Sequence, residues 1–259
     1  MTPALCNRLL NSQGWAILPK AVPRDLLRLM RDDLDVALNV CRNIQAANGV
    51  TENTVGTVHH LVALIQCRSF LEFLEANPAH PYITSFFQNK PYILQSIGGN
   101  YNYPSVENYA GNVHRDIRSY SFDPLMLNTL VALDDLTAEN GATWLLSGSQ
   151  VAIGKPSDET FDGFATQITA PAGSIVLWDS RIWHRAGVNK TGKPRRIITP
   201  IFTLPFYKQG LDYCRAIGQD VSRMSPRLQQ VLGYKARIPA SLSEWYRPKD
   251  GRFYQGDQG

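Results

Sequence analysis

Several features that would assign this chain to a familiar class are missing from its sequence. Its four cysteines, Cys6, Cys41, Cys67 and Cys214, lie far apart and form no C-x-x-C pair. A zinc knuckle or a redox dithiol is therefore not expected. Thiols spaced in this way are typical of free, mostly buried cysteines in a reducing compartment.

Long apolar runs are missing as well. No stretch of the sequence approaches the ~20 apolar residues that are needed to span a bilayer. The first ten residues, MTPALCNRLL, contain no apolar core long enough for a signal peptide. From these two observations we expect no membrane association and a cytoplasmic location.

Strong charge of one sign is also lacking. The 259 residues include 26 Lys and Arg and 22 Asp and Glu, which gives a formal net charge of +4, and the basic residues are scattered along the chain. Because no dense basic run is available to follow a phosphate backbone, a nucleic-acid partner is not expected. A small molecule remains the natural partner, and the chain is expected to be a monomer or a homodimer.

The first part of the chain, 1–90, is predicted to be mostly helical. The run WAIL at 15–18 predicts a short strand that ends at Pro19. Over 24–47, apolar residues recur at spacings of three and four, which predicts one long amphipathic helix. Shorter helices are expected over 68–76 and 81–88.

After residue 90 the pattern changes to many short strands separated by turn residues. The expected strands cover 92–97, 113–120, 128–133, 142–146, 167–169, 174–179 and 195–204. An aromatic-rich loop is expected over 98–104, and Asn140-Gly141 between two apolar runs is a hairpin signal. Many short strands at close spacing favour a sandwich or a barrel. We expect one domain over 1–259, with the β core at 91–206 and helices and a tail at 207–259.

A histidine and a carboxylate lie two residues apart in one of these runs, at His114 and Asp116. Side chains alternate between faces along a strand, so these two are expected to point the same way and Arg115 the other way. The best downstream supplier of a third ligand is His184, in SRIWHR. Two histidines and one carboxylate that leave other metal positions open are typical of non-haem Fe(II) oxygenases.

A candidate anion partner, Arg195, follows His184 by eleven residues on the next expected strand. A guanidinium can form two parallel hydrogen bonds with a carboxylate, which suits the distal carboxylate of a cosubstrate such as 2-oxoglutarate. Arg196 is the alternative, because alternation sends only one of the two side chains inward. A pair of surface charges at the end of a turn explains both arginines equally well.

Four stretches together resemble the phytanoyl-CoA dioxygenase (PhyH) family of Fe(II)/2-oxoglutarate oxygenases. They are NSQGWAILP at 11–19 with the following helix, HRD at 114–116, VALDDLTAENGATWLLSGS at 131–149, and WH at 183–184 with Arg195. The resemblance implies a mainly β fold with flanking helices around a double-stranded β-helix core of the jelly-roll, cupin-like kind. It also implies that His114, Asp116 and His184 are the catalytic iron ligands, that Arg195 binds 2-oxoglutarate, and that Fe(II), 2-oxoglutarate and O2 are required.

The sequence departs from the family pattern near the expected cosubstrate site. Arg115 replaces the usual Gln between the two proximal ligands, and Ala186 stands where a Ser often helps to hold 2-oxoglutarate. The strand after the H-x-D motif offers Asn128 and Thr129, where an aromatic or another polar group is common. Asn128 or Thr143 is therefore predicted to supply the missing cosubstrate contact.

Candidate substrate contacts follow from position alone. Arg118 shares the face of the H-x-D ligands if that strand continues, and we expect it to meet an anionic or carbonyl group, although a solvated rim charge explains it equally well. Tyr101 and Tyr103 are expected either to line the pocket or to belong to the core. For the adjacent His59 and His60, a structural or rim role is the main expectation and a substrate contact the alternative.

The sequence thus predicts an Fe(II)/2-oxoglutarate-dependent dioxygenase that hydroxylates a C–H bond of a small metabolite, with release of succinate and CO2, as would fit a biosynthetic pathway. The same cofactor chemistry ending in desaturation, ring formation or epimerisation is the first alternative. A non-catalytic jelly-roll protein that binds a ligand, or a cupin-like isomerase, is the second, and neither gives a reason for Arg195.

Overall fold

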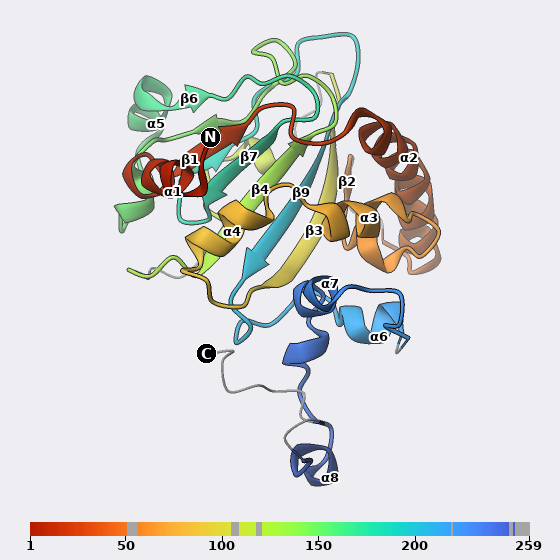
Figure 1. Ribbon diagram of the computed structural model, residues 1–259. Coiled ribbons are helices and arrows are strands. Elements are labelled where there is room, and N and C mark those ends of the chain that lie inside the picture. Colours follow the sequence, from red (N-terminus) through yellow and green to blue (C-terminus); the bar gives the residue numbers. More distant parts are fainter. Residues whose placement is uncertain (51–55, 105–108, 118–120, 219, 249–250, 252–259) are drawn as a thin grey trace.

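Two antiparallel sheets form the centre of the protein. The computed structural model describes residues 1–50, 56–104, 109–117, 121–218, 220–248 and 251 (Figure 1). The larger sheet has the strand order β1-β7-β4-β9-β3-β2 and the smaller one β6-β5-β8. The strands are β1 (Trp15–Leu18), β2 (Thr57–Val58), β3 (Ile93–Asn102), β4 (Met126–Ala132), β5 (Trp144–Leu145), β6 (Thr166–Gln167), β7 (Ile175–Asp179), β8 (His184–Arg185) and β9 (Arg195–Thr203).

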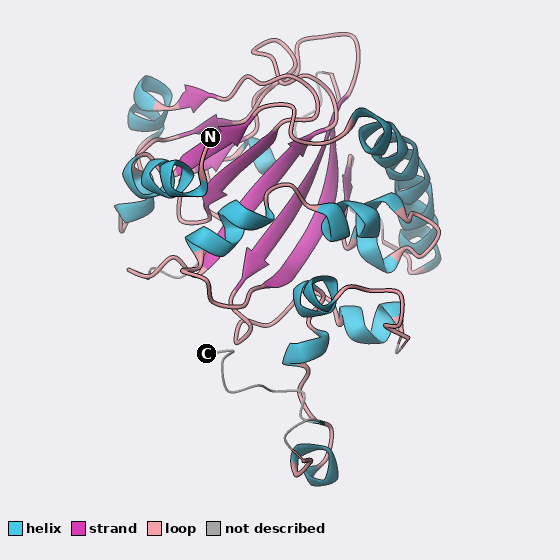
Figure 2. Cartoon of the chain, viewed as in Figure 1, coloured by secondary structure: helices cyan, strands magenta, loops and turns pink. Residues whose placement is uncertain are grey.

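Helices cover one face of the larger sheet. In Figure 2 they lie in front of and beside the strands, and Figure 1 shows α6, α7 and α8 below the sheet. The helices are α1 (Pro3–Ser12), α2 (Arg24–Ala47), α3 (Ser69–Ala76), α4 (His80–Phe86), α5 (Asp158–Phe164), α6 (Tyr213–Ile217), α7 (Pro226–Val231) and α8 (Leu242–Trp245). Among the described helices, none combines the length and the apolar character that crossing a bilayer requires.

Alternation along the strands gives the larger sheet two apolar faces. One face packs against the helices in a large cluster that includes Leu127, Val131, Leu177, Ile198 and Phe202. The other face points toward the smaller sheet in a second cluster that includes Leu130, Ala132, Val176, Trp178 and Ile197. This arrangement places the space between the two sheets next to the inward-facing residues of β4, β7 and β9, as the expected jelly-roll core requires.

The predicted N-terminal elements are largely confirmed. Helix α2 begins and ends where the apolar spacing predicts, and β1 covers the predicted strand. Helix α1 was not predicted, although its start carries a capping signal, because the Thr2 hydroxyl accepts a hydrogen bond from the Leu5 amide and Pro3 follows at the first helical position. Helix α5 was missed in the same way, with Ser157 as its cap.

Two expectations about the strand-rich part are wrong. The segment 98–102 is not a loop, because β3 stays paired with β9 from Gly98 opposite Thr199 to Asn102 opposite Arg195. Asn140-Gly141 does not join a two-stranded hairpin, because β4 and β5 belong to different sheets. It forms a turn in which Asn140 exchanges hydrogen bonds with Thr137.

The expected strand over 113–120 is also not formed in its described part, 113–117. Only one residue of that part, His114, makes a β-bridge, and its partner is His184. The amides of Asp116 and Ile117 donate instead to the carbonyl of Ser180, at 3.2 and 3.3 Å. The segment therefore follows the edge of the smaller sheet without adding a regular strand to it.

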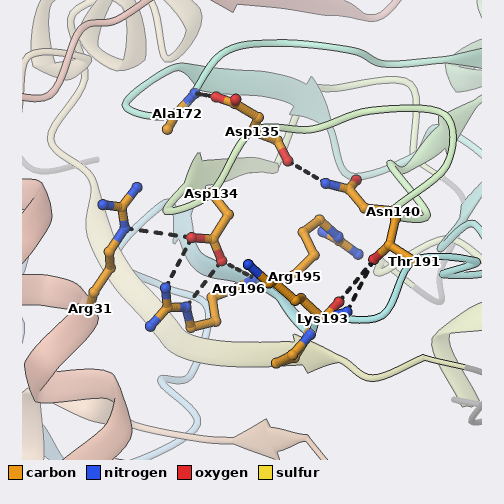
Figure 3. A pocket seen from close by; sticks show the side chains of 10 residues that line it. Arg31, Asp134, Asp135, Asn140, Ala172, Thr191, Lys193, Arg195 and Arg196 are labelled. Carbon is orange, nitrogen blue, oxygen red and sulfur yellow. Dashed lines mark hydrogen bonds and ion pairs between the residues drawn. The ribbon is translucent and has the colours of Figure 1, made fainter.

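A polar network around Asp134 ties α2 to the larger sheet (Figure 3). Arg196 donates to both carboxylate oxygens of Asp134 at 3.0 Å, and Arg31 lies 3.6 Å from one of them. The Arg31 Nε donates to the carbonyl of Leu133 at 2.7 Å, and Arg196 also lies 3.7 Å from Asp35 of α2. This half-buried network fixes the long helix against the start of β9.

We predict that Asp134→Ala lowers the free energy of unfolding by about 1–3 kcal/mol, because two guanidinium groups lose a half-buried acceptor. The matched control is Asp32→Ala, which removes the exposed ion pair between Arg28 and Asp32 on α2. This variant should change the free energy of unfolding by no more than about 0.5 kcal/mol. Denaturant unfolding followed by circular dichroism measures both. Equal stability of the two variants would contradict a structural role for Asp134.

Candidate active site

The two candidate histidines are joined by backbone hydrogen bonds. The His114 amide donates to the His184 carbonyl at 3.0 Å, and the His184 amide donates to the His114 carbonyl at 2.8 Å. This antiparallel bridge connects the H-x-D segment to β8 and sets the two imidazole ring centroids 4.3 Å apart. Two residues far apart in sequence thereby present their rings to the same space between the sheets.

Asp116 completes a group of three possible metal ligands. One ligand atom from each of His114, Asp116 and His184 lies within 4.8 Å of the other two. The Asp116 carboxylate oxygens are 3.7 Å from the Nε2 of His114 and 3.4 Å from the Nε2 of His184. Ligand atoms that each bind one ion at ~2 Å lie about 3 Å apart in an octahedral arrangement, so this cluster needs only a small contraction to hold a metal.

The ring orientations also suit metal binding. The Nδ1 of His114 lies 2.7 Å from the Asn112 carbonyl, and the Nδ1 of His184 lies 3.0 Å from the Ile182 carbonyl. A carbonyl oxygen only accepts, so each Nδ1 carries a proton, and in the neutral ring each Nε2 is then the free ligand atom on the side of Asp116. Burial lowers the pKa of His184 against the opposing effect of Asp116, which favours the neutral ring that ligates a metal.

Asn128 orients the carboxylate ligand. It projects from β4 and its Nδ2 donates to Oδ2 of Asp116, so the second oxygen of this carboxylate is held by an amide. The Asn128 Oδ1 is buried and has no hydrogen-bond partner within the described part of the chain. The prediction that Asn128 contacts the cosubstrate stays a prediction, whereas its contact with Asp116 was not foreseen.

Trp178 was missed by the sequence reasoning. It lies directly opposite Asn128 in the β4–β7 pairing, and its ring packs edge-on to the ring of His184 with centroids 5.4 Å apart. Its buried indole Nε1 has no acceptor among the described residues. The signal was available, because Val176 and Trp178 are two apart on β7 and alternation sends both toward the smaller sheet.

Arg195 is a buried cation with unused donors. Its side chain is 2% exposed, and its Nε and Nη1 have no hydrogen-bond partner in the described structure. Burial lowers the pKa of Arg195 to about 10, with Asp134 acting in the opposite direction, so the group is still charged at neutral pH. Burying an unpaired charge is costly, and the site therefore has a strong preference for an anion.

Alternation along β9 decides between the two arginines. Arg195 lines the cavity between the sheets together with Ile197, Thr199 and Ile201. Arg196 points to the helix side, where Asp134 binds it. Arg195 therefore remains the candidate for the cosubstrate carboxylate.

One cavity of about 230 Å³ contains both the His–Asp–His group and Arg195. Thr143 precedes β5 and Ala186 follows β8, and both line the cavity on the side of the smaller sheet. Its other wall comes from β2, β3, β9 and the residue after β2, and the side chains that line it there include Thr57, His59, Ser96, Asn100 and Thr199. A metal and an anionic cosubstrate thus have adjacent places in a single cavity.

Two predicted substrate contacts lie elsewhere. The Tyr101 hydroxyl donates to Asp35 of α2, and the Tyr101 ring stacks on Tyr103 with centroids 5.8 Å apart. Both pack with the helix-side cluster and neither lines the cavity. The reason is the continuation of β3 through Asn102, which turns Tyr101 to the helix face. Arg118 lies outside the described residues.

Arg115 points away from the ligands, as alternation predicts. Its guanidinium lies over the ring of Trp183, 5.1 Å from the centroid, and Nη1 is 3.4 Å from the Ala152 carbonyl. The departure from the usual Gln at this position therefore affects the packing behind the site and leaves the ligand set unchanged.

Comparison with protein families supports the same assignment. A family model described as phytanoyl-CoA dioxygenase (PhyH) matches residues 13–197. The chain belongs to the PhyH family. The matched range includes the three candidate ligands and Arg195.

Individual relatives of this PhyH protein cover different shares of it. It is 40% identical to the uncharacterized protein Rv1501 of Mycobacterium tuberculosis over a match of 134 residues. This match covers 51% of this chain and 49% of Rv1501. The match therefore spans about half the length of this relative. It is 26% identical over 275 residues to the dioxygenase olcK of Penicillium canescens, covering 95% of this chain and 85% of the relative.

The fold is shared with a solved structure, the non-heme alpha ketoglutarate dependent epimerase SnoN from nogalamycin biosynthesis. The TM-score is 0.56 at 14% sequence identity, and the alignment covers 78% of this chain and 80% of SnoN. At this level of identity the likeness shows a common architecture, which confirms the jelly-roll core with flanking helices.

We predict that Asn128→Ala lowers the affinity for a divalent metal by about 10- to 100-fold, because the amide that orients Asp116 is lost. The matched control is Thr129→Val on the same strand, whose hydroxyl donates to the Pro200 carbonyl on the opposite face. It should keep metal affinity unchanged even if stability falls. Anaerobic calorimetry with Co(II) gives both affinities, with His184→Ala as the variant that should lose binding. An unaffected Asn128→Ala would show that Asp116 needs no such support.

Proposed function

We propose that this protein is an Fe(II)/2-oxoglutarate-dependent dioxygenase that hydroxylates a C–H bond of a small molecule. One observation carries the proposal. A single cavity holds a His–Asp–His group with its three ligand atoms within 4.8 Å of one another and a buried arginine whose Nε and Nη1 lack partners. Either feature alone fits other functions, whereas the two together fit a metal and a dianionic cosubstrate.

The residues present fit the cofactors that the family implies. His114 and His184 direct their Nε2 atoms toward Asp116, whose carboxylate adds an oxygen ligand, and this donor set suits Fe(II). The guanidinium of Arg195 has an unpaired donor on each of two edges, Nε on one and Nη1 on the other. Either edge of a guanidinium can bind a planar carboxylate through two parallel hydrogen bonds, the second of them from Nη2. When bound, Fe(II) together with 2-oxoglutarate and O2 supplies the oxidant for the C–H bond, and succinate and CO2 are the coproducts.

The protein's own residues contribute position and exclusion of water. Asn128 holds one oxygen of Asp116, which keeps that carboxylate turned toward the histidines. Leu130 and Ile197 line the same cavity as the metal ligands and Arg195, so a bound cosubstrate would meet apolar surface there. A low local dielectric there strengthens the attraction between the guanidinium and a bound carboxylate.

The direct test adds Fe(II) and then 2-oxoglutarate to the purified protein without oxygen. A coloured metal-to-ligand charge-transfer band should appear only when both are present, and admission of air should yield succinate. A folded protein that binds Fe(II) but never develops the band would rule out the proposed chemistry. Asp116→Ala should abolish the band, because the metal loses its charged ligand.

We predict that Arg195→Gln weakens 2-oxoglutarate binding by about 100-fold, since charge-assisted hydrogen bonds from a buried cation are lost. Arg196→Gln is the matched control, because its side chain leaves the strand on the opposite face and binds Asp134. It should keep the affinity within about threefold even though such a variant loses stability. Titration of the charge-transfer band with 2-oxoglutarate measures both, and equal losses would argue against a specific role for Arg195.

A further inference from the structure

One wall of the active-site cavity is polar but uncharged. It is built from β2, β3 and β9 and from the residue that follows β2. The side chains that line it and can form hydrogen bonds are Thr57, His59, Ser96, Asn100 and Thr199. Among the described residues that line the whole cavity, the charged side chains are Asp116 and Arg195, and both are committed to the metal and the cosubstrate.

A notch lies in this wall at Gly98. This glycine is on β3, directly opposite Thr199 of β9. A Cβ at position 98 would lie 3.1 Å from the carbonyl oxygen of Val58, 3.4 Å from the Oγ1 of Thr199 and 3.8 Å from the Nδ1 of His59. The absence of a side chain therefore leaves a small space that these three polar atoms face. In the described part of the chain, neither the Thr199 hydroxyl nor the His59 ring has a hydrogen-bond partner.

The position of His59 is enforced by its neighbour. His60 adopts the left-handed conformation, with φ +57° and ψ +42°, which is unfavourable for a residue with a side chain and persists where the surroundings impose it. Its Nδ1 lies 2.9 Å from the hydroxyl of Tyr213, and the two rings meet edge to face. Tyr213 is fully buried in α6, so a rigid contact on one side of the turn holds His59 at the cavity on the other.

The chemistry of the notch selects its occupant. A hydroxyl group both donates and accepts one hydrogen bond, and the Thr199 hydroxyl and a neutral imidazole can each do the same. Partial desolvation lowers the pKa of His59, which favours its neutral ring. A carboxylate or phosphate finds no cation among the described residues of this wall, and an apolar group leaves the Thr199 and His59 atoms unpaired, which is unfavourable.

We propose that His59 and Thr199 hold a hydroxyl group of the substrate above Gly98, and that the substrate is an uncharged, polyhydroxylated molecule such as a glycoside or a cyclitol. The proposal rests on the proposed function, because it treats the rest of the cavity as the metal and cosubstrate site. Ser96 and Asn100 lie on the same face of β3 as Gly98, one on each side of it at a distance of two residues, or ~7 Å along the strand. Their side chains supply contacts for further hydroxyl groups of the substrate.

The first experiment compares two glycine variants. Gly98→Ala fills the notch, and its backbone φ lies outside the positive range in which alanine is strained, although the Val58 carbonyl at 3.1 Å has to shift by a few tenths of an ångström. Gly154→Ala is the matched control, because a Cβ there meets no atom within 4 Å. The probes are methyl α-D-glucopyranoside and myo-inositol, set against decanoate, decanoyl-coenzyme A and glucuronate. Each is added to the anaerobic Fe(II)/2-oxoglutarate complex to record a shift of the charge-transfer band, and then in air to record succinate.

We expect the neutral polyhydroxylated probes to shift the band and to raise succinate release at least tenfold, whereas the apolar and anionic probes do neither. Gly98→Ala should weaken that response at least tenfold with 2-oxoglutarate affinity unchanged, and Gly154→Ala should behave as the parent protein. His59→Asn, which keeps a hydrogen-bonding atom near Nδ1, should retain more of the response than His59→Phe. The His59 pair tests the idea even if Gly98→Ala folds poorly.

Three outcomes overturn the proposal. They are no response to either polyhydroxylated probe, a larger response to decanoate or decanoyl-coenzyme A, and equal responses of the two His59 variants. The band with Fe(II) and 2-oxoglutarate is recorded before any probe is added. Its absence would refute the proposed function itself, so the two failures are distinguished.

Discussion

The candidate site depends on one antiparallel bridge between His114 and His184. Two backbone hydrogen bonds, at 3.0 and 2.8 Å, join an irregular segment to a two-residue strand. Because both partners of the bridge are themselves candidate ligands, the same contact that closes the space between the sheets also fixes the spacing of the metal group. Asp116 follows two residues later and is held by the amide of Asn128. A metal would therefore bind to a frame that backbone geometry has already set.

The electrostatics of the site divide along β9. Arg196 turns outward and is neutralised by Asp134 and Asp35, while its neighbour Arg195 turns inward and keeps two donors unused. Asp134 still favours the charged form of Arg195, so the network on the outer face lowers the cost of the buried cation without satisfying its hydrogen bonds. A bound anion can then accept the hydrogen bonds that the protein does not accept from Arg195. In a salt bridge within the protein, by contrast, a neighbouring carboxylate already accepts them.

The sequence predicts more of the site than of the strands that carry it. The spacing of His114, Asp116 and His184 predicts the metal group, and the three- and four-residue apolar spacing predicts α2 from end to end. Pairing across strands is a long-range property, however, so the sequence did not show that β3 runs through Asn102. The expected loop left Tyr101 open to a place in the pocket or in the core, whereas the actual register places it against α2.

The sequence also could not decide the role of residues whose side chains suit two different contacts. Asn128 has an amide suited to a cosubstrate or to a carboxylate, and only its position opposite Trp178 on the inward face shows that Asp116 is its neighbour. His59 became a cavity residue through the backbone of His60, whose left-handed conformation has no signature in a pair of histidines. In both cases the deciding information is the three-dimensional neighbourhood.

The contact between His60 and Tyr213 gives the segment after β9 a part in selectivity. Helix α6 contains none of the three candidate metal ligands, yet its Tyr213 supports the turn from which His59 reaches the cavity. Sequence change in α6 can therefore alter the cavity near His59 while the three candidate ligands stay unchanged. Related enzymes could then change their preferred substrate through substitutions in a helix that lies outside the metal-ligand set. For the same reason, α6 is a suitable first target for directed evolution.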